Sequence, residues 1–543
     1  MLTGVSDDLA TITRDVGSLV AMQAGLMGLS VGVAAIFVET YVAVAFLLSA
    51  VVTGVIGLGA RRRFSDAPTP KMKHGMVIAA AGWFTTAVFG ALPFLLSAHL
   101  TPDAVAAARV PSGVAYDSSL LYFRQPLHAL FESMSGWTGS GLTMAVHEPT
   151  LPRAIQWWRS LIQYVGGVGV IVLTVSILSR PGSGSYTLFR SEAREEKIHP
   201  SVVSTVRTVW KIFIGYTALS VVVLFVAIAL SDPPIPLWEV GWQALNHAMT
   251  GLSTGGFSVT DNSIATYGSP LIETVLLPIM TLGAIAFPIH YVVLRDRDLG
   301  TLVGDVQTRW LLVLLVGGAV VLSAQNLVAL TDAFEAAWVG LPALGLSPEA
   351  VDAIRDSVFQ FISALTCTGF QSAPIGAWGA GGKLLVSGAM VLGGAAGSTV
   401  GGIKIIRGYT IARGIHWQFA RVFLPRNTVV TARIGDRVLD RDAMEAEFSE
   451  AAIVSLLWLI LLAVGSLVLV NVVGGEFGYA DALFEVASAQ GNVGLSTGIT
   501  GPSMPSLAEG MFLLNMWIGR LEIIPVLVFF RSLLWGLNRS NFQ

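Results

Sequence analysis

The sequence predicts an all-α polytopic membrane protein. Its 543 residues are 53% hydrophobic and only 12% charged, and its mean hydropathy is +0.69; this balance is typical of a chain that crosses a bilayer many times. Long apolar stretches recur along the chain, and a short glycine-centred motif occurs four times at similar spacing. These observations predict four pseudo-symmetric units, each a helix, a re-entrant pore loop and a second helix, around one pore, with an extra N-terminal transmembrane hairpin.

The apolar stretches set the number of crossings. A helix needs about 20 apolar residues to cross a hydrocarbon core of roughly 30 Å. Ten stretches reach this length, and the first two precede every copy of the motif, so they form the extra hairpin. The ten predicted spans are residues 19–38, 41–60, 74–96, 158–178, 208–230, 271–294, 310–330, 384–406, 452–473 and 511–534.

The motif has a central glycine followed by Leu or Phe. The central glycines lie 115, 113 and 125 residues apart, at Gly141, Gly256, Gly369 and Gly494, which is the period of a structural unit rather than of a short solenoid repeat. A Ser or Thr stands six residues before each of them. Each also follows a short apolar segment that we expect to be a re-entrant half-helix: residues 126–136, 237–251, 351–365 and 479–490.

Four such loops suit a potassium ion. A cation inside a membrane has to exchange its water for other oxygens, and a row of backbone carbonyls can supply them. Glycine freely adopts the backbone angles that such a row needs, and the C-terminal ends of the half-helices add partial negative charge. Helix packing explains a single glycine equally well, but it does not explain four aligned copies. The candidate filter residues are Gly139, Ser140, Gly141, Thr254, Gly255, Gly256, Cys367, Thr368, Gly369, Asn492, Val493 and Gly494.

The eighth predicted span is rich in glycine. Five glycines within ten residues disfavour a continuous helix by about 5 kcal/mol, at about 1 kcal/mol each. Irregular backbone at membrane depth is found where it is buried in protein or lines a wet cavity, so we expect a broken span that acts as a gate; a packed helix grooved by glycine is the alternative. The candidate gate residues are Gly393, Gly394, Gly397, Ser398, Thr399, Gly401, Gly402 and Arg520.

Arg520 is included because it is the only basic residue well inside a predicted span. Ionisable residues within membranes are costly and usually functional. Arg520 can hydrogen-bond carbonyls of the glycine-rich stretch, or it can pair with Glu522 for structure alone. We expect the first arrangement.

Basic residues predict the orientation, because cytoplasmic connections near helix ends retain positive charge. They gather on one side of the predicted spans, in residues 61–73, 180–211, 295–309 and 404–441, whereas residues 231–270 and 474–507 on the other side contain no Lys or Arg. Both termini are therefore expected in the cytoplasm. The outer side is acidic; such charge attracts cations into a vestibule, although carboxylates also simply solvate external loops.

Several stretches resemble one known family. Residues 133–141, 164–169, 255–258, 393–399 and 519–523 are similar to the Trk/Ktr/HKT potassium transporter superfamily, most of all to its TrkH-type bacterial potassium uptake subunits, and the resemblance covers nearly the whole chain. It implies K⁺ uptake across the bacterial cytoplasmic (inner) membrane, a K⁺ ion in the pore with no covalent cofactor, a homodimer, and a cytosolic TrkA-like nucleotide-binding ring that regulates opening. The family often has Thr at the positions of Gly139 and Ser140, so the selectivity for K⁺ over Na⁺ stays open.

The expected units are residues 1–73 for the start and extra hairpin, then 74–180, 203–296, 306–408 and 446–536 for the four pore repeats. An enzyme is not expected, because the spans offer only scattered His74, His290 and Glu522 and no paired catalytic groups. No nucleic acid partner is expected either. A secondary transporter of another cation such as Na⁺, or of a small solute, would more often show two inverted halves, and it stays as the alternative function.

Overall fold

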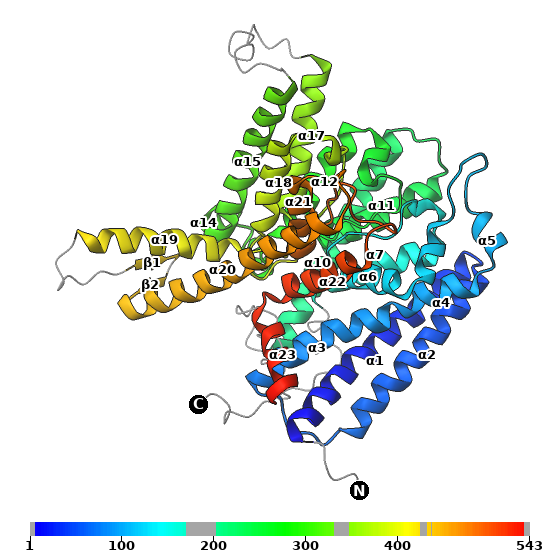
Figure 1. Ribbon diagram of the computed structural model, residues 1–543, viewed down its shortest axis with the longest axis horizontal. Coiled ribbons are helices and arrows are strands. Elements are labelled where there is room, and N and C mark those ends of the chain that lie inside the picture. Colours follow the sequence, from blue (N-terminus) through cyan, green and yellow to red (C-terminus); the bar gives the residue numbers. More distant parts are fainter. Residues whose placement is uncertain (1–5, 170–201, 331–346, 424–431, 436, 537–543) are drawn as a thin grey trace.

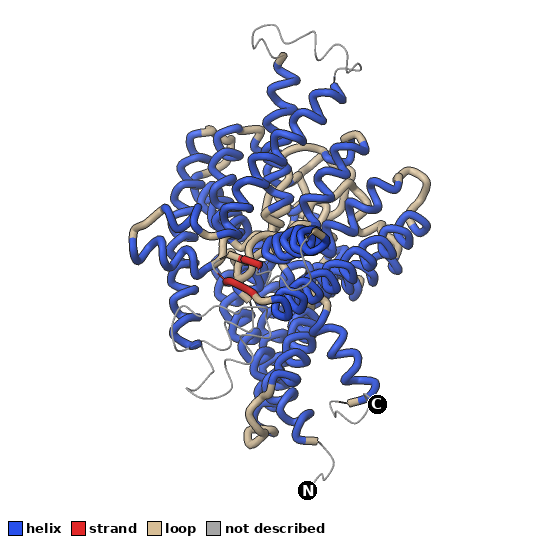
Figure 2. The backbone as a smooth tube through the Cα atoms, turned by 90° about the vertical axis from the view of Figure 1, so that its left-hand side faces the viewer, coloured by secondary structure: helices blue, strands red, loops and turns tan. Residues whose placement is uncertain are grey.

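The computed structural model describes residues 6–169, 202–330, 347–423, 432–435 and 437–536. Helices make up most of this part of the chain (Figures 1 and 2). A small antiparallel hairpin, β1 (Ala432–Ile434) and β2 (Arg437–Leu439), is the one sheet among the described residues. Residues 170–178 of the fourth predicted span and the basic residues Arg180, Arg190, Arg194, Lys197 and Arg426 lie outside the described residues.

The predicted N-terminal hairpin is present. Helices α1 (Asp7–Ile36) and α2 (Thr40–Arg63) pack side by side along their lengths (Figure 1). Helix α3 (Met72–Gly90) then begins beside the start of α1, where Asp8 contacts Lys73 at 2.8 Å and His74 at 2.7 Å. The start of α1 and the end of α23 (Ile524–Trp535) lie on the same side of the molecule in both views (Figures 1 and 2).

The four predicted half-helices are all present. They are α6 (Pro126–Thr138), α11 (Leu237–Leu252), α17 (Pro348–Leu365) and α21 (Tyr479–Gly491), and they contain 13 to 18 residues. At 1.5 Å per residue none reaches the roughly 30 Å of a hydrocarbon core. Residues at their C-terminal ends are largely buried, so the loops that follow lie inside the molecule.

Six of the described helical segments are long and apolar enough to cross a membrane, or up to eight if each of two bent pairs counts as one span. They are α1, α2, the α3–α4 segment that ends with α4 (Leu92–Leu100), α10 (Val202–Leu230), α15 (Val306–Leu330) and α20 (Arg441–Val472). Of the fourth predicted span, residues 158–168 belong to α7 (Arg153–Val168), which begins five residues before the predicted start. With 16 residues, α7 is not among these six. The chain is thus a multi-pass membrane protein.

The sixth and tenth predicted spans are not the continuous helices that we expected. The chain bends by 105° between α12 (Pro270–Ala284) and α13 (Phe287–Asp296), and by 114° between α22 (Ser506–Leu521) and α23. Each second helix has a proline in its first turn, Pro288 or Pro525. Proline has no backbone N–H to continue the preceding ladder, and its ring clashes with the carbonyl four residues before it, so each helix stops and a new one begins in another direction.

The eighth predicted span is broken, as its glycines indicate. Helix α18 (Ala380–Val391) ends after 12 residues, and α19 (Ile405–Val422) begins only after an irregular segment. Helix α19, the β1–β2 hairpin and the start of α20 extend from the body as an arm (Figure 1). The arm has a small core of its own, formed by Trp417, Ile434, Leu439 and Met444.

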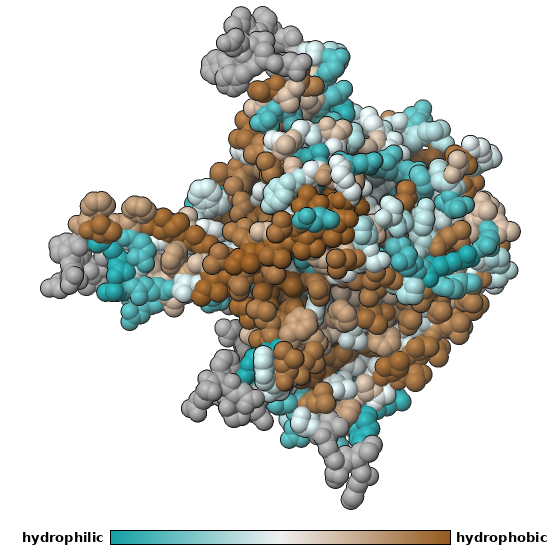
Figure 3. All heavy atoms as spheres, in the orientation of Figure 1, coloured by the Kyte–Doolittle hydropathy of each residue, from teal (hydrophilic) through white to brown (hydrophobic). Residues whose placement is uncertain are grey.

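Hydrophobic residues cover much of the face shown in Figure 3, over α20 and the lower part of the molecule, whereas hydrophilic residues gather at the upper right. Exposed apolar side chains along α2 and α20, such as Val51, Val55 and Leu467, are those expected to face lipid. The remaining short helices are α5 (Asp103–Ala107), η1 (Ser119–Arg124), η2 (Glu148–Thr150), η3 (Ser263–Tyr267), α14 (Gly300–Gly304) and η4 (Ile375–Ala377).

Candidate functional site

The four loops after the half-helices share one backbone pattern. The central glycines Gly141, Gly256, Gly369 and Gly494 have φ values of +80°, +74°, +80° and +103°. The residues two positions earlier are also left-handed: Gly139, Thr254, Cys367 and Asn492 have φ between +48° and +73°. Three of these four carry side chains, and left-handed backbone is uncommon there, above all for a β-branched residue such as Thr254. The same costly conformation at equivalent positions indicates a conformation that the surrounding structure imposes.

The Ser or Thr six residues before each glycine holds the loop to its half-helix. Its carbonyl accepts a hydrogen bond from the N–H of the residue just before the central glycine: Ser135 from Ser140, Thr250 from Gly255, Ser363 from Thr368 and Ser488 from Val493, at 2.8 to 2.9 Å. The hydroxyls of Thr250 and Ser363 also donate to the carbonyls of Phe257 and Phe370, both at 2.8 Å. The repeated Ser or Thr found in the sequence therefore anchors each loop to its half-helix.

The four loops form a closed ring in chain order. A Cβ atom added to Gly141 would lie 2.3 Å from the carbonyl oxygen of Gly255, and one on Gly256 would lie 2.0 Å from that of Thr368. On Gly369 it would lie 1.8 Å from the oxygen of Val493, and on Gly494 2.6 Å from that of Ser140, which returns to the first loop. Each central glycine thus faces the residue before the next central glycine, and no side chain fits.

A second repeated position, not predicted from the sequence, lies nine residues before each glycine. Its side chain is polar and buried in all four copies: Glu132, His247, Gln360 and Glu485. Each holds the segment that leaves its loop. Glu485 accepts from Ser496 Oγ at 2.6 Å and Thr497 N at 2.7 Å, His247 contacts Ser258 Oγ at 3.0 Å, and Gln360 donates to Ser372 Oγ at 3.1 Å. A polar residue at one offset in four apolar segments was the signal that could have revealed it.

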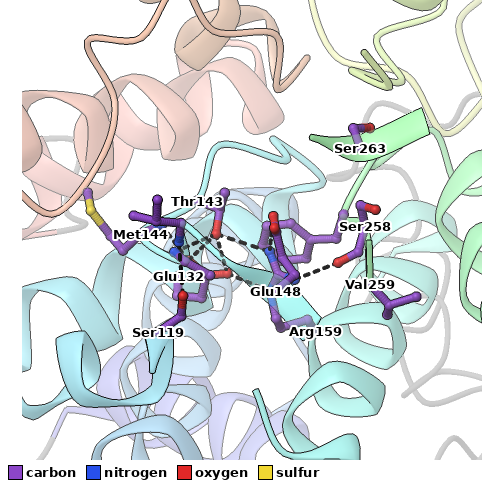
Figure 4. A network of polar contacts seen from close by, with 12 residues as sticks. Ser119, Glu132, Thr143, Met144, Glu148, Arg159, Ser258, Val259 and Ser263 are labelled. Atoms are coloured by element: carbon purple, nitrogen blue, oxygen red, sulfur yellow. Dashed lines mark hydrogen bonds and ion pairs between the residues drawn. The ribbon is translucent and has the colours of Figure 1, made fainter. Parts of the chain in front are cut away.

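Arg159 on α7 was missed as well. Its side chain is only 1% exposed, and it is the one buried arginine among the described residues. Its Nε donates to Glu132 at 2.7 Å, its Nη1 to the carbonyl of Ser258 at 2.7 Å and its Nη2 to Thr143 Oγ1 at 3.0 Å (Figure 4). The cation also lies 4.2 Å from the centre of the Phe257 ring. One buried charge therefore contacts both the first and the second loop.

Glu148 lies beside this network in η2, with Oε1 3.9 Å from Arg159 Nη2 (Figure 4). Burial raises the pKa of its carboxyl to about 8, and the Arg159 charge only partly opposes this. Desolvation disfavours the ionised form of a carboxyl. Burial therefore favours the protonated form of Glu148.

The glycine-rich segment between α18 and α19 folds back on itself. Leu392 and Ile403 form a parallel bridge, and Gly393 N donates to the carbonyl of Ile403 at 2.8 Å. A Cβ on Gly393 would lie 1.9 Å from the carbonyl oxygen of Gly401, and Gly397 and Gly402 have φ values of +81° and +67°. The alternative of a packed continuous helix is wrong.

This segment touches the ring of loops. The hydroxyls of Thr399 and Thr254 lie 2.8 Å apart, and a Cβ on Gly401 would be 2.3 Å from the carbonyl oxygen of Gly491, just before Asn492. Within the segment, Ser398 Oγ donates to the carbonyl of Ala395 at 2.6 Å. Gly394 lies close to the end of α12, since a Cβ there would be 3.0 Å from the carbonyl oxygen of Ala284. The segment thus contacts the second and fourth loops.

Arg520 joins this segment to α7. Its Nη1 donates to the carbonyl of Thr399 at 2.7 Å, and its Nη2 donates to the carbonyls of Gly166 and Gly167 at 2.6 and 2.9 Å. The expected contact with a carbonyl of the glycine-rich segment is therefore present. Gly166 and Gly167 are near the C-terminal end of α7, where a cation also interacts favourably with the helix dipole. Glu522, the alternative partner, forms an ion pair with Arg407.

The fold defines a multi-pass helical membrane protein, in which four helices too short to cross a bilayer end in a closed ring of backbone and an irregular segment lies against that ring. The family follows from comparison with known proteins. The family model described as "TrkH: Cation transport protein" matches residues 74–536, and the chain belongs to this family.

Individual relatives agree with this assignment. The chain is 31% identical over 468 residues to an uncharacterized cation transporter of Methanocaldococcus jannaschii, covering 85% of this chain and 83% of the relative. It is 28% identical over 546 residues to the Trk system potassium uptake protein TrkH of Salmonella typhimurium, covering 96% and 99%. The crystal structure of the potassium transporter TrkH from Vibrio parahaemolyticus matches with a TM-score of 0.73 at 23% identity, covering 97% and 99% of the two chains; this likeness shows the fold.

Proposed function

We propose that this protein takes up K⁺ across the cytoplasmic membrane through the ring of four loops. The observation that carries the proposal is the contact of each central glycine with the carbonyl of the residue before the next central glycine. Relatives named as potassium uptake proteins support the choice of ion. The twelve candidate filter residues are then the K⁺ site, arranged by four pore repeats with the bounds expected from the sequence.

The backbone of the loops suits this task. In each loop, left-handed residues at the central position and two positions earlier flank a residue with negative φ. Such alternation can turn successive carbonyl groups toward the same side, where they replace the water shell of a cation. The C-terminal ends of four half-helices adjoin the ring, and each is equivalent to about half a negative charge. Because only the central glycine recurs in all four loops, we expect one well-formed ion site.

The segment of residues 392–404 is the proposed gate, with Arg520 as its clamp. It contacts the ring through Thr399 and Gly401, so a passing ion would meet it next. We further propose a homodimer with both termini in the cytoplasm. A TrkA-like nucleotide-binding ring would then dock on the basic arm and control opening.

The test is ion uptake by purified protein in liposomes loaded with K⁺, followed with ⁸⁶Rb⁺ outside. We expect Rb⁺ uptake that external K⁺ inhibits and external Na⁺ inhibits much less; liposomes without protein give the background. Inhibition by Na⁺ as strong as by K⁺ would instead favour a transporter of another cation, which the unusual Gly139 and Ser140 of the first loop make the second candidate. Absence of protein-dependent Rb⁺ uptake would contradict the proposed function.

A further inference from the structure

Helix α7 carries a buried polar face. Gln156, Arg159 and Gln163 are spaced three and four residues apart, so they lie on one side of the helix, and all three are no more than 1% exposed. Helix α7 follows the first loop in the chain. Arg159 and Gln163 nevertheless bind the second loop, more than ninety residues away.

Gln163 holds both sides of a central glycine. Its Nε2 donates to the carbonyl of Gly255 at 2.6 Å, and its Oε1 accepts from the N–H of Phe257 at 2.9 Å. These two groups flank Gly256. The side chain also fits closely, because a Cβ on Gly255 would lie 2.5 Å from Gln163 Cδ.

The Gly255 carbonyl is one of the four that close the ring, facing Gly141. The other three belong to Ser140, Thr368 and Val493, and none of them accepts a hydrogen bond from a side chain within the described ranges. A hydrogen bond fixes the direction of a carbonyl and uses part of its acceptor capacity. The four loops of the ring therefore differ, and the direction of the Gly255 carbonyl in the second loop is fixed by a side chain outside the loops.

Arg159 extends the same support. It bonds the carbonyl of Ser258, and it is anchored to the first loop through Glu132 and Thr143. Charge-assisted hydrogen bonds of this kind are roughly twice as strong as neutral ones. The pair Arg159 and Gln163 thus fixes the second loop relative to the first.

We propose that Gln163, supported by Arg159, is a positioning residue that determines ion specificity by setting the orientation of the Gly255 carbonyl. The inference rests on the proposed function of the ring as a K⁺ site. It adds a residue outside the four loops to the determinants of selectivity.

The experiment replaces Gln163 by Glu, which keeps the shape and the acceptor for Phe257 N but, once the carboxyl is ionised at high pH, removes the donor to the Gly255 carbonyl. A second variant, Gln163→Met, keeps the length and removes both hydrogen bonds. Permeability ratios for K⁺ and Na⁺ are measured from reversal potentials in planar bilayers. We expect the ratio to fall about threefold to tenfold in both variants, since a net hydrogen bond contributes about 1 kcal/mol.

Gln156→Glu is the matched control. Gln156 is equally buried on the same helix, and its amide bonds the carbonyl of Glu148 at 3.0 Å and Trp242 Nε1 at 2.8 Å, without contact to a candidate filter residue. Its ratio should stay at the wild-type value.

The outcomes separate the two proposals. Wild-type ratios in the Gln163 variants, alongside an altered ratio in Gly256→Ala, would overturn the inference and leave the proposed function standing. An equal change in Gln156→Glu would also overturn it, as would failure of both Gln163 variants to give a monodisperse protein, because the residue would then serve folding. A wild-type protein that conducts neither Rb⁺ nor K⁺ would overturn the proposed function itself.

Discussion

At the scale of single residues, strain and support coincide in the ring. Thr254, Cys367 and Asn492 keep left-handed backbone, at a cost of order 1–3 kcal/mol each. The hydrogen bonds from Ser140, Gly255, Thr368 and Val493 back to the half-helices hold the loops in that conformation. The residues of the ring are therefore constrained by their fastenings as well as by their own preferences.

Gly369→Ala should lower the K⁺/Na⁺ permeability ratio by about tenfold or abolish K⁺ flux. The new Cβ would lie 1.8 Å from the carbonyl oxygen of Val493, so the third and fourth loops would have to move apart. Reversal potentials and Rb⁺ uptake provide the measurement. Gly388→Ala is the control, because a Cβ there has no atom within 4 Å and alanine favours the helix by about 1 kcal/mol. A wild-type ratio in Gly369→Ala would reject the filter assignment.

Arg520→Ala should raise the open probability of the protein without its regulator by about one to two powers of ten. Hydrogen bonds to a charged group contribute about 1.5–3 kcal/mol each, and each 1.4 kcal/mol is a factor of ten. Single-channel recording gives the open probability, and the ion selectivity should stay near the wild-type value. An unchanged open probability in a folded variant would reject gating by Arg520. Its contacts to Gly166 and Gly167 would then serve only the structure at the end of α7.

The raised pKa of Glu148 predicts that the stability of the protein depends on pH. Because its pKa is raised to about 8 in the folded protein, its contribution to stability is complete below about pH 4.5, the ordinary range for Glu. It is then lost as the pH rises to about 8, at up to about 1.4 kcal/mol per pH unit. Glu148→Gln removes this loss, so the Tm of the variant relative to wild type should increase from pH 5 to pH 8 and level off above. A constant difference in Tm would show that the folded carboxyl titrates normally.

At the scale of elements, the sequence predicts most of the helices and the ring but not what supports it. Apolar length and the spacing of glycines locate the half-helices, because both are local properties. The bends after Ala284 and Leu521 were missed although Pro288 and Pro525 are visible in the sequence, since hydropathy does not register a lost hydrogen bond. Arg159 could not be placed, because its contact with Ser258 joins residues 99 positions apart.

The glycine-rich segment gives the prediction at this scale. Deleting Gly397 to Gly401 removes Thr399 and its contacts with Thr254 and Arg520, yet leaves the bonds of Arg520 to α7. We expect a higher basal K⁺ flux with near wild-type selectivity, measured as Rb⁺ uptake and open probability without a regulator. Wild-type open probability in this deletion would reject gating by the segment, whatever the result for Arg520→Ala.

At the scale of the whole molecule, charge and shape single out the arm. Its described basic residues include Arg413, whose Nε donates to the carbonyl of Arg433 at 3.2 Å, and Arg421, which pairs with Glu445 at 2.8 Å. The arm also projects from the body (Figure 1). Such a surface suits a soluble partner, although positive charge is also what the topology rule alone would place there.

Cross-linking tests this docking surface. Cys367, the single native cysteine, is buried, so Arg413→Cys gives one accessible thiol on the arm. We expect a bifunctional reagent on it to capture a soluble nucleotide-binding protein expressed in the same cells, while the matched Ser503→Cys, in the loop before α22, does not. Flux that responds to nucleotide without capture from position 413 would contradict the docking site.

The closed ring also determines how a single mutation affects the site. Since one polypeptide supplies all four loops, one codon change alters one loop and leaves the other three intact. In a pore built from four identical subunits, the same change would occur in all four. Natural variation can therefore change the ring one loop at a time. The four loops can therefore diverge in sequence, as the contact of Gln163 with only the second loop illustrates.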